Sequence, residues 1–256
     1  MTSLRDKIVF ITGASSGIGR SCARAFARQG ARVLMAARRL DRLEKLAADL
    51  KAEFGAESHC FGLDVCDQAA VERAVFALSP AWEAVDILVN NAGLSRGLDK
   101  LYEGKIADWE EMIDTNVKGL LYISRAVIPG MVRRGRGHII NIGSIAGRDF
   151  YPNGNVYCAT KAAVNALSKG LRLDLVGTPL RVSLVDPGMV ETEFSLVRFH
   201  GDGDRAAKVY QGLIPLTPDD IADAVVFCAT RPPHVNISEL VVYPTAQASA
   251  TLVHRK

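Results

Sequence analysis

The chain has no cysteine pair and no clustered metal-binding side chains, and each absence excludes a class of function. Its 256 residues include an odd number of cysteines without a C-x-x-C pair, which predicts free thiols in a reducing, cytoplasmic compartment. These are Cys22, Cys60, Cys66, Cys158 and Cys228. The 5 histidines form no i, i+4 pair and no cluster with cysteine, so we expect no metal site.

Long apolar runs and a strong charge of one sign are also missing. No apolar run approaches ~20 residues, and a strand predicted from Lys7 leaves no room for a signal peptide, so we expect no membrane span and no secretion. The formal net charge of +3 is too small for the strong field that attracts nucleic acid or a membrane. With 48% hydrophobic residues, the chain can form one sizeable α/β domain, for which we expect a small-molecule substrate.

Short apolar runs alternate with helical patterns along the sequence. We predict strands near residues 7, 32, 58, 86, 138, 181 and 239, with helices between them. This alternation is typical of a doubly wound, Rossmann-like parallel sheet with helices on both faces. We see no domain boundary and predict a single domain over residues 1–256.

The N-terminal region combines a buried strand, a glycine-rich turn and a helix. Residues 7–12 have the pattern of the strand, and residues 21–28 have that of the helix. This order aims backbone N–H groups and a helix N-terminus at a phosphate. The G-x-x-x-G-x-G spacing differs from the G-x-G-x-x-G fingerprint, and a glycine turn without a ligand is the alternative. We predict a nucleotide site that includes Gly13, Ser15, Ser16, Gly17, Ile18 and Gly19.

The second predicted strand indicates which dinucleotide binds there. Residues 31–37 form this strand, and Arg38 and Arg39 follow it with no acidic residue before them. An NAD site has a carboxylate at this point for the ribose 2′-hydroxyl, whereas a guanidinium group matches the 2′-phosphate of NADP. We therefore predict NADP as the cofactor. The alternative is that the two arginines only begin a surface helix.

Polar residues follow three further predicted strands, at the edge where open α/β sheets bind ligands. Asp64, with Val65 beside it, is placed to reach the adenine end of the cofactor. Residues that fix turns beside the ribose follow the next strand: Asn90, Asn91, Ala92 and Gly93. Ser144 follows a third strand and can hold the substrate oxygen, although a serine in this place is usually a turn former.

Tyr157 and Lys161 have the spacing of a tyrosine that serves as a general base. A free phenol has a pKa of ~10 and is a poor base at neutral pH. In a helix, a lysine four residues later lies on the same face, where its charge favours the phenolate. Tyr157 is therefore a candidate acid/base and Lys161 the group that lowers its pKa. Taken alone, this spacing is more often a solvated surface pair.

Taken in order, these motifs resemble the short-chain dehydrogenase/reductase family over nearly the whole chain. The resemblance rests on TGASSGIG at 12–19, NNAG at 90–93, DTNVKG at 114–119, Ser144, Tyr157 with Lys161, and the dipeptide at 187–188. It implies a tetrad in which Ser144 positions the substrate, Tyr157 is the acid/base, Lys161 holds the nicotinamide ribose and Asn116 anchors a proton-relay water. From its own context, Asn116 could instead cap or kink a helix predicted at about 108–133. The resemblance further implies cofactor contacts from Pro187, Gly188, Val190 and Thr192.

Longer runs are similar to one subgroup, the NADP-dependent 3-hydroxy acid dehydrogenases that act on serine and allo-threonine. These runs are residues 143–149, 190–199, 232–237 and 244–247. The resemblance implies a cytosolic homotetramer that acts on the CH–OH group of a small 3-hydroxy acid (serine, allo-threonine, 3-hydroxypropionate) or on its semialdehyde. Relatives with the same runs are similar to reductases of other small aldehydes or ketones, such as sulfoacetaldehyde, which stay an alternative.

Residues 191–216 follow a strand on the ligand side of the sheet and are predicted to form a substrate lid. A lid there would exclude water during hydride transfer, and a passive surface loop is the alternative. Arg198 lies in this segment and is our candidate ligand for the substrate carboxylate, with Arg148 as the second choice. The alternative for Arg198 is an ion pair with Glu191 or Glu193 that shapes the lid.

Two other functions use parts of the same pattern. A non-catalytic NADP-sensing protein would have no need for Ser144, Tyr157 and Lys161 together. A sugar-nucleotide epimerase uses the same tyrosine and lysine but needs a larger substrate domain, and too few residues follow Pro187. The sequence therefore favours an enzyme that transfers hydride between NADP and a small hydroxy acid.

Overall fold

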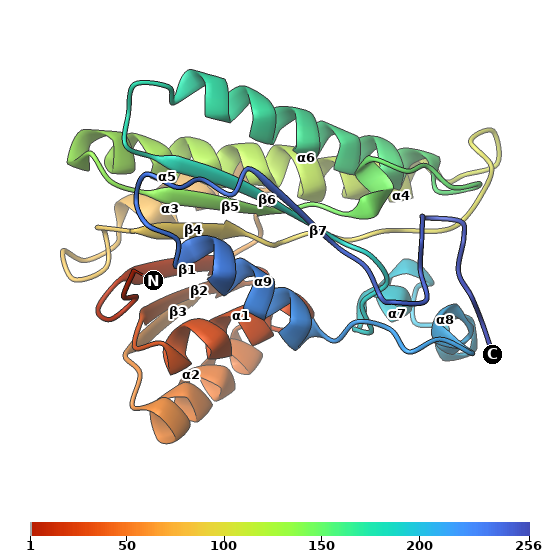
Figure 1. The fold of residues 1–256 in the computed structure, drawn as a ribbon, viewed down its shortest axis with the longest axis horizontal. Helices are drawn as coiled ribbons and strands as arrows, with labels where there is room; N and C mark the ends of the chain where they lie inside the picture. The colour runs from red at the N-terminus through yellow and green to blue at the C-terminus, as the bar shows by residue number, and fades with distance from the viewer. Residues whose placement is uncertain (1) are drawn as a thin grey trace.

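A parallel sheet lies between two layers of helices in the computed structural model, which describes residues 2–256 (Figure 1). The 7 strands have the order β3-β2-β1-β4-β5-β6-β7, so the order reverses between β1 and β4, where such sheets bind ligands. The strands are β1 (Ile8–Thr12), β2 (Arg32–Ala37), β3 (Ser58–Gly62), β4 (Ile87–Asn90), β5 (His138–Ile142), β6 (Arg181–Pro187) and β7 (Glu239–Val242). The predicted doubly wound sheet and its seven strands are confirmed.

Helices cover both faces of this sheet. They include α1 (Gly17–Arg28), α2 (Leu40–Phe54) and α9 (Pro218–Ala229) on one face, and α3 (Gln68–Phe76), α5 (Leu120–Arg134) and α6 (Asn155–Asp174) on the other. Phe26 and Leu43 belong to the hydrophobic core on the first face, and Ile123 and Val71 to the core on the second. Every residue of β1 and β4 is buried, because a parallel sheet is covered on both sides.

The helix predicted at about 108–133 is interrupted by a π-helical turn. It consists of α4 (Ile106–Ile113), the π turn (Asp114–Gly119) and α5. Asn116 lies in this π turn, and the alternative in which it caps or kinks the helix stays a prediction. The helix ends at Gly135, whose φ is 63°, with Arg133 and Arg134 in its last turn, where cations suit the helix dipole and the exposed carbonyls.

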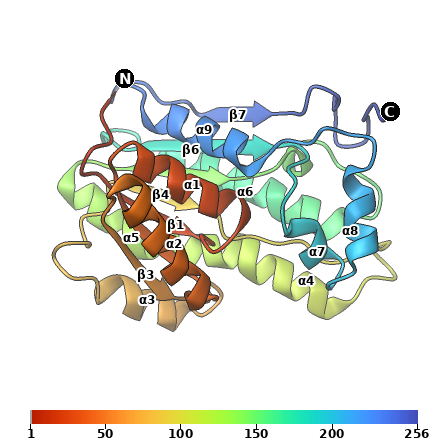
Figure 2. The same cartoon turned by 90° about the horizontal axis from the view of Figure 1, so that it is seen from below.

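Residues 191–216 form a small helical unit beyond the carboxyl ends of the strands (Figure 2). The unit contains α7 (Phe194–Arg198) and α8 (Gly203–Tyr210). At its base Val190 pairs with Leu216, and the N–H of Glu191 donates to the Leu216 carbonyl at 2.9 Å. The segment thus leaves and rejoins the body of the protein at one place, which is the arrangement that a lid needs. Its movement stays a prediction.

Candidate active site

A cavity of about 900 Å³ lies at the carboxyl ends of the strands, between the sheet and the predicted lid. Predicted site residues from all parts of the chain line it: Gly13, Ser15, Ser16, Gly17, Ile18, Arg38, Arg39, Asp64, Val65, Asn91, Ala92, Gly93, Ser144, Tyr157, Lys161, Pro187, Gly188, Val190, Thr192 and Arg198. Two residues of the predicted site, Gly19 and Asn116, stand behind this lining and support it.

The glycine turn and the 90–93 loop form one rigid unit at the floor of the cavity. A Cβ atom on Gly19 would stand 2.4 Å from Nδ2 of Asn91 and 2.5 Å from the carbonyl oxygen of Gly13, so only glycine fits. Asn91 Nδ2 also donates to the carbonyls of Thr12 at 2.9 Å and Gly13 at 3.2 Å. The side chain of Ser16, the N-cap residue of α1, makes no hydrogen bond to the helix. The first backbone N–H groups of α1 can therefore bind an anion. These features fit the pyrophosphate of a dinucleotide.

The corner after β2 holds a cluster of arginines. Arg39 is the N-cap residue of α2, and its guanidinium group donates to the hydroxyls of Ser15 (3.3 Å from Nε) and Ser16 (2.8 Å from Nη2). Arg38 is 62% exposed, and its Nη1 lies 4.0 Å from Oε1 of Glu111 on α4. No carboxylate takes the place at the end of β2 that an NAD site requires, so the donor set fits a 2′-phosphate.

Tyr157 and Ser144 meet at the opposite end of the cavity. Tyr157 is buried on α6, and burial raises the pKa of its phenol well above the ordinary value, while the nearby Arg198 and Ser144 side chains act to lower that pKa. Ser144 follows β5, its N–H donates to Oδ1 of Asp186 at 2.9 Å, and its Oγ accepts from the N–H of Ala146 at 3.1 Å. Ser144 and Tyr157 thus line the same part of the cavity, and the predicted role of Ser144 in holding the substrate oxygen stays a prediction.

Lys161 is buried one turn after Tyr157 on α6. Its Nζ donates to the carbonyl of Ile142 at 3.0 Å, which fixes the ammonium group at the end of β5. Burial lowers the pKa of Lys161 to about 8, against the opposing effect of Asp186. Among the groups that lower the pKa of Tyr157, Arg198 has the largest effect. The predicted effect of Lys161 on that pKa stays a prediction.

Asn116 acts as a buried clamp between three segments. Its Oδ1 accepts from the N–H of Leu94 at 2.8 Å, and its Nδ2 donates to the Leu94 carbonyl at 2.8 Å and to Oγ1 of Thr160 at 3.0 Å. The side chain therefore joins the π turn to the 94–99 loop and to α6, next to Tyr157. Its predicted relay water stays a prediction.

Arg198 points from the lid toward Tyr157. Its Nη2 donates to the Tyr151 hydroxyl at 2.8 Å and its Nε to Oγ of Ser95 at 3.1 Å, and the guanidinium carbon lies 5.3 Å from the centre of the Tyr157 ring. The alternative in which Arg198 pairs with Glu191 or Glu193 is wrong, because its hydrogen-bond partners are two hydroxyls and its neighbours are aromatic rings.

Arg148, the second choice for the carboxylate ligand, has a different role. Its guanidinium group is held by Asp186 at 2.5 Å and by Glu239, and it lies outside the cavity lining. This choice was wrong, because the fold brings β6 and β7 against residue 148. Residues outside the predicted site also line the cavity, among them Tyr151, Phe194, and Ala250 and Thr251 near the C-terminus. Of these residues, only Tyr151 could have been suspected from the sequence, because it forms an aromatic pair with Phe150 shortly before Tyr157.

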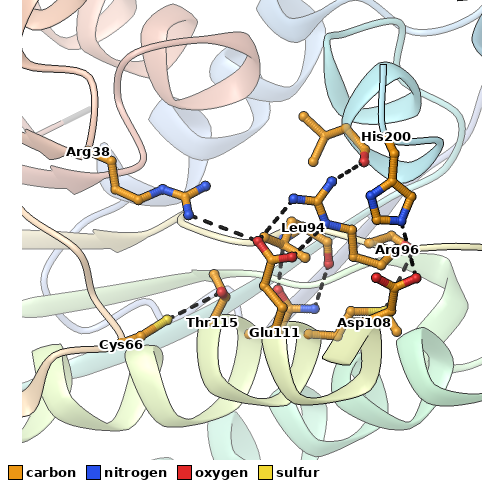
Figure 3. A network of polar contacts seen from close by, with 12 residues as sticks. Arg38, Cys66, Leu94, Arg96, Asp108, Glu111, Thr115 and His200 are labelled. Atoms are coloured by element: carbon orange, nitrogen blue, oxygen red, sulfur yellow. Dashed lines mark hydrogen bonds and ion pairs between the residues drawn. The ribbon is translucent and has the colours of Figure 1, made fainter. Parts of the chain in front are cut away.

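The lid rests on α4 through a second group of polar contacts (Figure 3). Arg96 forms a bidentate pair with Glu111, with Nε 2.6 Å from Oε2 and Nη2 3.0 Å from Oε1, and it also donates to the carbonyl of Val197 in α7. His200 Nε2 lies 3.2 Å from Oδ2 of Asp108. Glu111 thus faces both Arg96 under the lid and Arg38 at the arginine corner.

Residues 2–256 contain no group of three or more side chains that could hold a metal ion. In the same range, no helix combines the length and the apolar character needed to cross a membrane.

Comparison with known proteins gives a family and close relatives. Residues 7–201 match the model of a family described as short chain dehydrogenase. The chain is 49% identical over 251 residues to the NADP-dependent 3-hydroxy acid dehydrogenase YdfG of Escherichia coli (strain K12), covering 97% of this chain and 100% of that protein. It is 42% identical over 257 residues to the NADP-dependent 3-hydroxy acid dehydrogenase of Schizosaccharomyces pombe (strain 972 / ATCC 24843), covering 100% and 99%.

A solved structure gives the same result for the fold. The closed form of serine dehydrogenase complexed with NADP+ matches with a TM-score of 0.91 at 49% identity, over 97% of this chain and 100% of that one. The likeness includes both the sheet and the segment beyond it, because so little of either chain is left uncovered.

Proposed function

This chain belongs to the short chain dehydrogenase family, and from that premise we propose that it transfers hydride between NADP(H) and a small 3-hydroxy acid or its semialdehyde. The glycine turn would hold the pyrophosphate, and Arg38 and Arg39 would hold the 2′-phosphate. When bound, the nicotinamide supplies the hydride exchange. Named relatives that use NADP and act on 3-hydroxy acids support the proposal.

Tyr157 would move the proton that accompanies the hydride. At neutral pH its raised pKa keeps the phenol protonated, which is the form that gives a proton to a carbonyl oxygen during reduction. In oxidation the phenolate form of the same residue would accept the proton of the hydroxyl. Ser144, which lines the cavity together with Tyr157, would hold the substrate oxygen, and Lys161 would hold the ribose beside it.

The single observation that carries the substrate class is the position of Arg198. A guanidinium group that lies beside the acid/base and contacts only neutral partners gives an anionic substrate one cation to bind. In a 3-hydroxy acid the carboxylate stands two carbons from the reacting hydroxyl carbon, so both ends can be held at once. A sulfonate such as that of sulfoacetaldehyde carries the same charge and is the second candidate for this cation.

The test is NADPH oxidation with a panel of small aldehydes and ketones, and NADP reduction with hydroxy acids. We expect turnover with malonic semialdehyde, 3-hydroxypropionate and serine, and much less with uncharged analogues of equal size. Preference for uncharged substrates would reject a 3-hydroxy acid as the substrate. Preference for sulfoacetaldehyde would favour a sulfonate, the second candidate. Absence of turnover with the whole panel would support the non-catalytic alternative, and equal use of NADH would reject the cofactor.

We further propose a homotetramer in a reducing, cytoplasmic compartment. The subgroup resemblance supports the tetramer, and five cysteines that are all free thiols support the compartment. Light scattering coupled to gel filtration tests the first statement, since a mass near that of four chains of 27.6 kDa is expected. Fractionation of the cell that makes the protein tests the second.

A further inference from the structure

Glu193 connects the lid to the arginine corner. It is the N-cap residue of α7, and its Oε2 lies 2.9 Å from Nη1 of Arg39 while its Oε1 lies 2.8 Å from Nη1 of Arg42. Arg42, on the first turn of α2, was not among the predicted site residues. One lid carboxylate therefore joins two guanidinium groups of the body of the protein.

The neighbours of Glu193 place this contact at the predicted phosphate site. Arg39 also donates to Ser15 and Ser16 of the glycine turn. Thr192, the residue before Glu193, packs on the same turn, since a Cβ atom on Gly17 would stand 3.3 Å from its Cγ2. The lid thus touches the turn that would hold the pyrophosphate of the cofactor and the arginines that would hold its 2′-phosphate.

A 2′-phosphate and the Glu193 carboxylate need the same donors. The phosphate monoester carries roughly −1.5 to −2 charges at neutral pH, and each of its oxygens accepts from guanidinium groups as a carboxylate does. Glu193 cannot keep both arginines while the phosphate binds them, because two anions would then share the same cations at close range. The two ion pairs of Glu193 can also be exchanged easily, because the three side chains are between 41% and 44% exposed and such ion pairs are weak.

We propose that Glu193 occupies the 2′-phosphate site when no cofactor is bound, that Arg42 is a further ligand of the 2′-phosphate, and that the phosphate displaces Glu193 and so releases this contact of the lid. The inference rests on the proposed NADP specificity. It makes Glu193 and Arg42 determinants of cofactor choice that act together with Arg38 and Arg39.

Calorimetric titration with 2′,5′-ADP and with 5′-AMP separates the parts of this proposal, because the two ligands differ only in the 2′-phosphate. The variants are Glu193→Gln, Arg42→Met, and Glu191→Gln as the matched control, since Glu191 is an exposed lid carboxylate that makes no ion pair within the described residues. We expect Glu193→Gln to tighten 2′,5′-ADP binding about five-fold and to leave 5′-AMP unchanged. Arg42→Met should weaken 2′,5′-ADP about five-fold, and Glu191→Gln should change neither ligand.

A fluorescence titration reports the lid contact without turnover. Trp109 of α4 packs against the same small hydrophobic cluster as Phe194 and Val197 of α7, and the other tryptophan, Trp82, is removed by Trp82→Phe. In this background 2′,5′-ADP should shift the Trp109 emission toward that of the Glu193→Gln variant, and 5′-AMP should not.

Several results would overturn the inference. Unchanged or weaker 2′,5′-ADP binding by Glu193→Gln would do so, as would equally tighter binding by Glu191→Gln. Binding of 2′,5′-ADP by Arg42→Met with the wild-type affinity, or no change in Trp109 emission on adding 2′,5′-ADP, would also do so. A wild type that binds 5′-AMP as tightly as 2′,5′-ADP would instead reject the NADP assignment itself, so the two failures are distinguishable.

Discussion

The two ends of the cavity differ in how firmly their charges are held. Tyr157 and Lys161 are only 8% and 6% exposed, and Lys161 has a backbone carbonyl as its fixed partner. At the arginine corner, Arg38 is 62% and Arg39 41% exposed, and their ion-pair partners are carboxylates of other elements. In the proposed function, burial would fix the groups that move a proton, where small displacements are costly, whereas exposed ion pairs would leave the proposed cofactor-binding groups free to exchange partners.

The largest expected effect is at the buried end. Tyr157→Phe keeps the ring and removes the ionisable oxygen, so kcat should fall by at least ~100-fold. Circular dichroism and the melting temperature should stay close to those of the wild type, because the phenol packs mainly through its ring. Near-normal turnover in a folded variant would contradict the role of Tyr157.

A smaller, substrate-dependent effect is expected where the lid meets the buried end. Arg198→Met removes a charge-assisted contact of ~1.5–3 kcal/mol, so kcat/KM for 3-hydroxypropionate should fall about 30-fold. For an uncharged alcohol of similar size it should change little. Arg205→Met, a lid arginine outside the cavity lining, is the control and should change neither substrate. Equal losses for both substrates would assign Arg198 a structural role.

At the exposed corner we expect a change of preference with little change of rate. Arg38→Glu removes a phosphate ligand and adds repulsion, so the ratio of kcat/KM for NADP to that for NAD should fall about ten-fold or more. Lys45→Glu makes the same charge change on an exposed position of α2 and should leave the ratio unaltered. If both variants shift the ratio alike, the overall electrostatic field of the arginine corner, and not a direct contact with Arg38, selects the cofactor.

The smallest effect is a pH dependence of stability that the buried end alone should show. The pKa of Lys161 falls from 10.5 to about 8 on folding, so the unfolded chain binds more protons between these values and stability gained from this group rises with pH. Between pH 8 and 9 the free energy of unfolding of the wild type should increase by about 1 kcal/mol relative to Lys161→Met. Urea unfolding of both proteins across this range measures the difference, and parallel curves would show an ordinary lysine pKa.

Much of this site follows from local sequence because a parallel sheet brings the ends of its strands to one edge. A residue that directly follows a strand, such as Ser144, Asn91 or Arg38, therefore lies near the cavity whatever its distance along the chain. The tyrosine and lysine are four residues apart on one helix, so their shared face is also a local property. These are the parts of the site that the sequence analysis placed correctly.

The interaction partners of the charged side chains, in contrast, could not be predicted from the sequence. Arg148 and Arg198 are both arginines near the catalytic motifs, but one is held by Asp186 and Glu239 while the other faces Tyr157. Neither fact is visible in the sequence, because an ion pair forms wherever the fold brings opposite charges within a few ångströms.

The sequence by itself determined the layers, the strand positions, the glycine turn and the tyrosine and lysine pair, since each depends on hydrophobic period or on spacing within one element. Only the tertiary structure decided that Glu193 meets Arg39, 154 residues earlier in the chain, and that Asn116, within a π turn, binds the backbone of Leu94. The physical reason is that such contacts depend on how α7 and the π turn are placed against the sheet, and packing of whole elements sets that placement.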